Sequence, residues 1–165
     1  HKVCMDCNGK TIAILPSQIS KITPAVNKNL AKCIFEKGGL LLTEYYKDPN
    51  GRQDAIGRFI ERDRLQAMFS KVVIMIASYR KNEGDSGSRH AMQAALNYGL
   101  ERYIMFNEVS DENDKQFGLN KDFLNGKNGS VKILNKSSIE VISNIINTNL
   151  VNCPDNLKTE QLKFF

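Results

Sequence analysis

The stretch Val72-Val73-Ile74-Met75-Ile76-Ala77 is the most apolar run of the chain and decides the predicted fold. A short, continuously apolar run of this kind is typical of a strand buried on both faces of a sheet. A charged loop over 79–85 follows it, and Ser86-Gly87-Ser88 then opens a helical segment over 88–98 that Gly99 ends. We therefore predict a strand–loop–helix unit, with 72–77 as the central strand of a parallel sheet.

The same alternation of strands and helices extends in both directions along the chain. It predicts an α/β protein with a Rossmann-like, doubly wound, mainly parallel sheet and helices on both faces. We expect one such domain over 1–147 and a polar C-terminal tail over 148–165. The predicted strands are 11–15, 40–45, 102–106 and 130–134, and the predicted helices are 25–37, 62–70, 120–125 and a segment that starts at the capping box Ser137–Glu140 and ends near 147. A polar loop is expected over 47–55.

Composition narrows the possible partners of the chain. Its 165 residues carry a formal net charge of +5 and a pI of about 9.0, a mild basic bias that suits a polyanion. Of the four cysteines, Cys4 and Cys7 form a single CxxC, and only two histidines accompany them, so we expect no metal site. No signal peptide and no membrane-length apolar run is visible. These features predict a cytoplasmic protein without a membrane partner, cofactor or visible catalytic constellation.

Three arginines, Arg58, Arg62 and Arg64, precede the central strand and are candidate phosphate ligands, because a guanidinium offers a rigid fork of donors. The alternative is that they pair with carboxylates of the chain, for which Glu44, Glu61 and Asp63 are the candidates. Glu44 ends a predicted strand and could orient an arginine or serve as a general base. Tyr45 and Tyr46 follow it, and either could stack on a base or simply pack.

The Ser86-Gly87-Ser88 turn is a second candidate phosphate site, since free backbone N–H groups and the positive dipole end of a helix favour an anion. The alternative is an ordinary helix start with a permissive glycine. Arg89 and His90 add donors near the same turn. The motif is neither a Walker loop nor GxGxxG. Together with the basic charge, these residues predict a nucleic-acid or nucleotide binder.

The order of several short motifs resembles the DNA-processing protein A (DprA/Smf) family from His1 to about Ile142. Each motif is short, but they follow one another in the order of the family. They are Gly9–Leu15 ("G-T-I-A-V-L"), Gly39–Tyr45 ("G-x-L-L-S-E-Y"), Phe59–Arg64 ("F-P-x-R-N-R"), Ser86–Ser88 ("S-G-S") and Gly118–Lys121 ("G-T/C-N-R/K"). The chain departs from the family where Ile60 replaces the proline and Asp63 the asparagine.

The resemblance implies a Rossmann-like domain that binds single-stranded DNA and loads the RecA recombinase in natural transformation and recombination. It implies DNA contacts from Arg58, Arg62, Arg64, the Ser86–Ser88 turn and Lys121, supported by Glu44, Phe59 and Asp63. It also implies a homodimer. The upstream half of the family domain is not seen ahead of His1, so we expect the chain to be the C-terminal portion of that domain.

Two other functions stay open at this point. Ligands of parallel sheets bind at the carboxyl ends of the strands. That edge of the predicted sheet could bind a small nucleotide, which would make the chain a nucleotide-binding or nucleotide-sensing protein. The chain could also be an interaction module that binds neither ligand.

Overall fold

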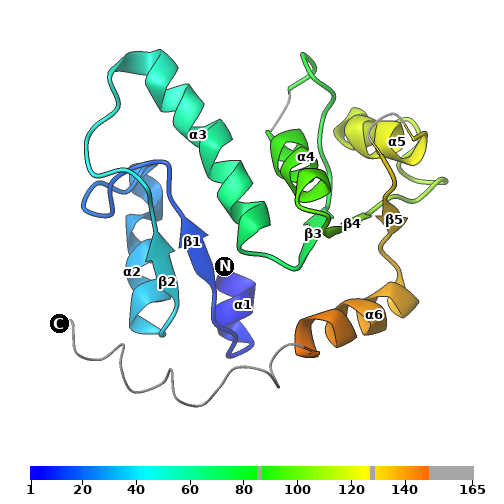
Figure 1. The fold of residues 1–165 in the computed structure, drawn as a ribbon, viewed down its shortest axis with the longest axis horizontal. Coiled ribbons are helices and arrows are strands. Elements are labelled where there is room, and N and C mark those ends of the chain that lie inside the picture. Colours follow the sequence, from blue (N-terminus) through cyan, green and yellow to red (C-terminus); the bar gives the residue numbers. More distant parts are fainter. Residues whose placement is uncertain (85–86, 127–128, 149–165) are drawn as a thin grey trace. The chain divides into compact units, whose positions relative to one another are not determined.

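The computed structural model describes residues 1–84, 87–126 and 129–148. These residues form two compact units (Figure 1). The first comprises 1–70 and 87–98, and the second comprises 71–84, 99–126 and 129–148. Among the described residues, no helix is long and apolar enough to cross a membrane. The single domain over 1–147 stays a prediction, and positions 149–165 of the predicted tail lie outside the described residues.

The first unit contains a two-stranded parallel sheet and its helices. Strands β1 and β2 pair in parallel, with Ile12 opposite Leu40 and Ile14 opposite Leu42. Since parallel neighbours need a crossover connection, the intervening helix α2 supplies it. In chain order the elements are α1 (Lys2–Asp6), β1 (Ile12–Ile14), η1 (Ala25–Asn27), α2 (Lys28–Glu36), β2 (Leu40–Leu42), α3 (Gly51–Met68) and α4 (Ser88–Asn97).

The core of this sheet is apolar and closely packed. Met5, Ala13, Leu15 and Ile34 form a buried cluster that joins α1, β1 and α2. Gly39 enters β2 so close to its neighbours that a Cβ atom there would lie 2.5 Å from the Thr11 carbonyl oxygen. Only glycine fits this approach, whereas Gly38 before it has a left-handed φ of +75° that also favours glycine.

The second unit contains a three-stranded parallel sheet in the order β3–β4–β5. Its elements are β3 (Val72–Met75), β4 (Glu101–Ile104), η2 (Lys115–Phe117), α5 (Gly118–Leu124), β5 (Lys132–Ile133) and α6 (Lys136–Asn147). Tyr103 and Ile104 are fully buried. The parallel pairing in both units confirms the predicted α/β, Rossmann-like arrangement.

The buried amide of Asn120 connects two strand ends in the second unit. Its Oδ1 accepts the backbone N–H of Ser78 at 3.1 Å, and its Nδ2 donates to the carbonyl oxygens of Ile76 and Met105 at 2.9 and 2.7 Å. Ile76 and Ser78 follow β3, and Met105 follows β4. One side chain from α5 therefore ties the carboxyl ends of both strands together.

Three details of the predicted elements were wrong. Helix α3 begins at Gly51, so the loop expected over 47–55 is shorter and the helix expected from Arg62 starts earlier. In the described three-stranded sheet, β4 lies in the middle, although the 72–77 run is more apolar. The capping box of α6 is formed by Asn135 and Ser138, because Asn135 has the extended backbone that an N-cap needs.

Candidate nucleic-acid interface

Helix α3 carries most of the predicted site residues. The predicted residues on α3, at the start of α4 and just after β2 all belong to the first unit. Helices α3 and α4 pack against each other and lie side by side in Figure 1. The described part of the Ser-Gly-Ser turn, Gly87 and Ser88, starts α4, whereas Ser86 lies outside the described residues. The arginine segment and the start of α4 lie close together at Asp63 and Gly87, which are described below.

Arg58 is a structural residue in this arrangement. Its side chain is buried, and its Nη1 and Nη2 donate to the carbonyl oxygens of Lys47 and Asp48 at 2.8 and 3.2 Å. Nη2 also forms an ion pair with Asp54 at 2.9 Å, one turn earlier on α3. The guanidinium lies over the Tyr45 ring, 4.4 Å from its centroid. Arg58 thus holds the loop after β2 against α3, and a phosphate has little access to it.

Arg62 lies between an aromatic ring and a buried carboxylate. Its Nε and Nη2 donate to Asp63 Oδ1 at 3.3 and 2.9 Å, and its guanidinium carbon lies 5.5 Å from the centroid of the Phe59 ring. The Asp63 side chain is only 7% exposed, whereas that of Arg62 is 25% exposed. Within the described part of the chain, Nη1 of Arg62 has no acceptor, so one donor group is available to a ligand.

Arg64 is the most accessible of the three arginines. Its Nη2 donates to both oxygens of Glu44, at 2.8 and 2.7 Å, and hydrogen bonding to this carboxylate raises the pKa of the Arg64 guanidinium. Both side chains are exposed at the surface. Glu44 therefore orients an arginine, which is one of the two roles predicted for it. Among the described residues, no acceptor engages Nε or Nη1 of Arg64, which leaves donors for a phosphate.

The start of α4 lies against α3 at Asp63. A Cβ atom on Gly87 would lie 3.1 Å from Asp63 Oδ2, and Gly87 has a left-handed φ of +81°. The left-handed backbone favours glycine here, and the short distance to Asp63 leaves little room for a larger side chain. Gly87 and Ser88 already make interactions in the structure. The phosphate-binding role of the Ser86–Ser88 turn stays a prediction.

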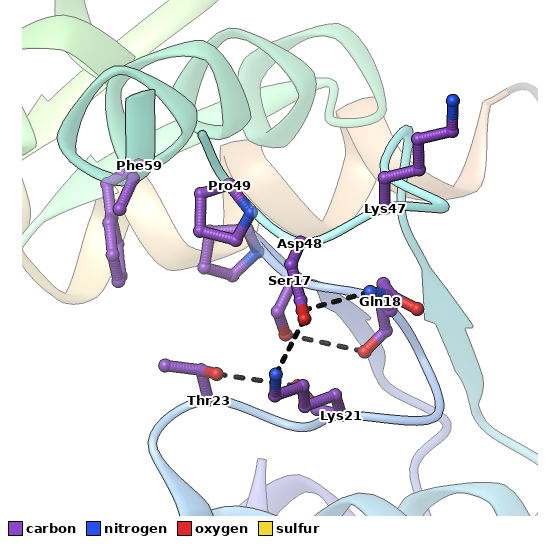
Figure 2. Close-up of a pocket in the computed structure, with 10 residues that line it drawn as sticks. Ser17, Gln18, Lys21, Thr23, Lys47, Asp48, Pro49 and Phe59 are labelled. Atoms are coloured by element: carbon purple, nitrogen blue, oxygen red, sulfur yellow. Dashed lines mark hydrogen bonds and ion pairs between the residues drawn. The ribbon is translucent and has the colours of Figure 1, made fainter. Parts of the chain in front are cut away.

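A pocket of about 330 Å³ opens next to this part of α3 (Figure 2). It lies where β1 and β2 end, the edge at which parallel sheets bind ligands. Asp48 spans its polar side, accepting from Gln18 at 3.0 Å and pairing with Lys21 at 2.8 Å, and Phe59 and Pro49 contribute apolar surface. The lining residues are Pro16, Ser17, Gln18, Lys21, Thr23, Lys47, Asp48, Pro49, Ala55 and Phe59.

Comparison with known proteins places this arrangement in a family. The family model described as DNA recombination-mediator protein A matches residues 1–141. The chain belongs to the DNA recombination-mediator protein A family. The predicted DprA/Smf resemblance is thereby confirmed.

Two curated relatives in this family are both called Protein Smf. The protein from Synechocystis sp. is 34% identical over 82 residues, which cover 50% of this chain and 20% of the relative. The Escherichia coli protein is 29% identical over 105 residues, which cover 64% of this chain and 26% of the relative. The chain thus matches about a fifth to a quarter of the length of these relatives.

Lys121 lies in the second unit of this family member, on α5. Its Nζ forms an ion pair with Glu112. Both residues line a small pocket of about 100 Å³, together with Arg80 and several acidic side chains of the loop before η2. Lys121 is therefore partly neutralised in its own unit.

The two tyrosines that follow β2 differ in role. The hydroxyl of Tyr45 donates to Glu61 at 2.5 Å, and Arg58 covers the ring, which is the packing role rather than base stacking. Burial, followed by the hydrogen bond to Glu61, raises the pKa of Tyr45 to about 12. Tyr46 is 80% exposed and remains a candidate for stacking.

Sequence reasoning missed the polar side of the pocket, which Ser17, Gln18, Lys21 and Asp48 form. A usable signal was present, because 16–23 and 47–49 follow directly after two predicted strands. No group of three or more His, Cys, Asp or Glu side chains able to hold a metal is found within 1–84, 87–126 and 129–148.

Proposed function

We propose that the chain binds single-stranded DNA as part of DNA processing and recombination, through the first unit. One observation carries the proposal: Phe59 both lines the pocket and contacts the Arg62 guanidinium. A base-sized apolar surface and a phosphate ligand therefore meet on adjacent turns of α3. Bases and phosphates alternate along a single strand, so one nucleotide can use both features.

The pocket suits a flat, polar-edged ring. Its volume of about 330 Å³ falls within the range of small-molecule sites. Phe59 and Pro49 offer apolar surface to a ring face, while Gln18, Lys21 and Asp48 offer donors and acceptors to its edge. Stacking on an aromatic side chain is tolerant of base identity, which fits binding without strong sequence preference.

Arg62 and Arg64 suit the phosphate backbone of a DNA strand. Arg62 and Arg64 each use one part of the guanidinium on a carboxylate, and this holds the rest of the planar group in place. Orientation by a carboxylate lowers the entropy lost when an arginine binds phosphate. We keep Lys121, Ser86, Gly87 and Ser88 as secondary candidates.

The finer functions rest on the family alone. We propose loading of the RecA recombinase, a role in natural transformation, and assembly as a homodimer, together with the 1–147 domain as the unit of function. Sedimentation at several protein concentrations tests the dimer, and co-precipitation with RecA in the presence of oligo-dT tests the partner.

Fluorescence anisotropy with a labelled dT oligomer tests the central proposal. We expect the double variant Arg62→Ala/Arg64→Ala to lose at least about tenfold in affinity and about 1.4 from the log–log salt slope, since each single-strand phosphate contact contributes about 0.7. Arg52→Ala is the matched control, because Arg52 is an exposed arginine on the same helix. Equal losses in the control would show a diffuse charge effect instead.

The pocket is tested separately by Phe59→Ala. Stacking on an aromatic residue contributes about 1–3 kcal/mol per base, so this variant should bind at least about fivefold more weakly with an unchanged salt slope. Phe69→Ala, at the exposed C-terminal end of α3, is the control. Unchanged affinity of Phe59→Ala would remove the pocket from the proposal.

A nucleotide-binding function is the second candidate, because the pocket volume also suits one mononucleotide. Thermal unfolding with single nucleotides and with oligo-dT separates the two functions. A rise in Tm with a mononucleotide but not with oligo-dT would favour this second function.

A further inference from the structure

Asp48 is the residue around which the polar side of the pocket in the first unit is built. Its Oδ1 accepts a hydrogen bond from Gln18 Nε2 at 3.0 Å, and its Oδ2 pairs with Lys21 Nζ at 2.8 Å (Figure 2). A carboxylate has about four lone-pair sites, so each oxygen can accept one further hydrogen bond. The side chain of Asp48 is 57% exposed, which leaves these sites accessible to a ligand in the pocket that it lines.

The backbone of Asp48 is held as firmly as its side chain. The buried Arg58 guanidinium donates to the carbonyl oxygens of Lys47 and Asp48 at 2.8 and 3.2 Å, and Pro49 restricts the residue before it. The hydrogen bond from Lys21 is the largest cause that lowers the pKa of the Asp48 carboxyl, so the group stays ionised and acts only as an acceptor. A carboxylate fixed in this way loses little entropy when it binds a ligand.

Lys21 and Asp48 present a fixed order of hydrogen-bonding groups to the pocket. Lys21 Nζ is a donor, and the two oxygens of Asp48 beside it are acceptors. Among the DNA bases, only guanine has the complementary order on its Watson–Crick edge, where the acceptor O6 is followed by the donors N1–H and N2–H. Thymine would place its O2 against the carboxylate, and adenine and cytosine offer only one donor group. A site that bonds both donors of guanine discriminates against bases that lack one of them.

We propose that the pocket is selective for guanine, with Asp48 accepting from N1–H and N2–H and Lys21 donating to O6. This inference rests on the proposed function, since it names the base that the pocket binds within a DNA strand. Phosphate contacts and stacking on Phe59 tolerate every base, whereas the polar side of the pocket adds a preference at one position of the strand. Asp48 is then the residue that determines specificity.

The first test compares guanine with hypoxanthine, which lacks only the N2 amino group. Fluorescence anisotropy measures the binding of the full chain to two labelled oligomers, one of alternating dG and dT and one of alternating deoxyinosine and dT. The alternation places the purine in the pocket in every second binding register. We expect the dG oligomer to bind at least about threefold more tightly, with the same salt slope, because the difference lies in a base contact. Equal affinities of the two oligomers overturn the inference.

The second test uses Asp48→Asn, which keeps the size of the side chain and replaces one acceptor with a donor. We expect the difference between the two oligomers to disappear, because one donor of guanine then loses its acceptor. Glu36→Gln is the matched control and should keep the preference of wild type, since Glu36 is a carboxylate of the same unit that is 59% exposed and pairs with Lys32. A purely structural role of Asp48 would weaken both oligomers equally and leave the preference in place, and this result would also overturn the inference.

Guanine selectivity and the proposed function can fail separately. If both oligomers bind with equal affinity, guanine selectivity fails and DNA binding stands. If neither oligomer binds, the proposed function fails, and calorimetric titration with dGMP and with deoxyinosine monophosphate examines the pocket alone. Tighter binding of dGMP that Asp48→Asn abolishes would then support the guanine pocket, whereas equal binding or no binding of the two nucleotides would overturn it.

Discussion

Asn120 shows at the residue scale how one buried amide can organise a sheet edge. It is completely buried, and its three hydrogen bonds reach the backbone after β3 and after β4. A side-chain amide has one acceptor oxygen and two N–H donors, so it can accept from one N–H and donate to two carbonyl oxygens at once. A motif residue that the sequence placed in a short helix is thus a structural connector of the second unit.

Substitution of Asn120 should destabilise the protein by an amount that depends on the chemistry of the new side chain and not only on its size. Asn120→Ala leaves buried polar groups without partners, so the free energy of unfolding should fall by at least about 2 kcal/mol. Asn120→Asp should be at least as harmful, because it replaces both N–H donors with an oxygen that faces two carbonyl oxygens. Urea unfolding measures both variants against Asn125→Asp, an exposed control at the C-terminal end of the same helix. An Asn120→Asp protein as stable as wild type would contradict this account.

Tyr45 gives a prediction about alkaline pH. Burial and the Glu61 hydrogen bond raise its pKa from 10.0 to about 12, so the folded state keeps a proton that the unfolded state loses. The contribution of Tyr45 is fully present below pH 10 and disappears as the pH rises toward about 12. Unfolding free energies across this range should fall more steeply for wild type than for Tyr45→Phe. Tyr46→Phe should follow wild type, and parallel curves for all three proteins would refute the assignment.

Helix α3 shows at the element scale that proline and glycine do not always mark a loop. Pro49 and Gly51 indicate a loop, yet the helix begins at Gly51 because Asp54 secures the first turn. Its Oδ2 accepts the backbone N–H of Asn50 at 2.7 Å and pairs with Arg58 one turn later. These bonds lower the pKa of Asp54, with the Arg58 hydrogen bond as the largest cause.

Removal of this carboxylate should unravel the start of α3. In Asp54→Ala we expect faster amide hydrogen exchange over 51–57, with little change in the C-terminal half of the helix. Wild type should show the same loosening as the pH falls below the ordinary aspartate pKa of 3.8 through the lowered value, because the stabilisation needs the ionised form. Gln53→Ala, in the same turn, is the control. Uniform exchange changes along the helix would speak against a local role.

At the scale of the whole molecule, the count of 23 lysines and arginines overstates the number of cations that are free to bind a phosphate. Arg58, Arg62 and Arg64 all have carboxylate partners within the first unit, and Lys121 has one in the second. Of the three arginines predicted as phosphate ligands, Arg62 and Arg64 then contribute with their exposed parts at the proposed site.

This limited charge predicts a shallow salt dependence. Two phosphate contacts give a log–log slope of about −1.4, so tripling the salt concentration should weaken oligo-dT binding only about fivefold. Anisotropy titrations at four or five salt concentrations measure the slope for the wild-type chain. A slope several times steeper would mean that many more lysines and arginines contact the strand.

Much of the fold was predictable because it depends on local pattern. Apolar runs bounded by glycine and proline marked the strands, and helical segments marked α2 and α4. A capping-box pattern marked α6, and the order of motifs from Gly9 to Lys121 identified the family. Buried parallel strands need continuous apolarity wherever they occur, so these signals survive without knowledge of any distant contact. The exact starts of helices were less predictable, since the start of α3 at Gly51 depends on the side chain of Asp54, three residues further along.

The sequence by itself thus determined the α/β class, the family and the residue types of the candidate site. Only the tertiary structure decided how each charge is used: Arg58 turned inward, Asp63 buried against Gly87, Arg64 held by Glu44, and a pocket assembled around Asp48. The reason is physical. These groups meet across separations such as 20 residues for Arg64 and Glu44 and 27 for Lys21 and Asp48, and whether a charge is paired or free depends on such contacts rather than on its neighbours in the chain.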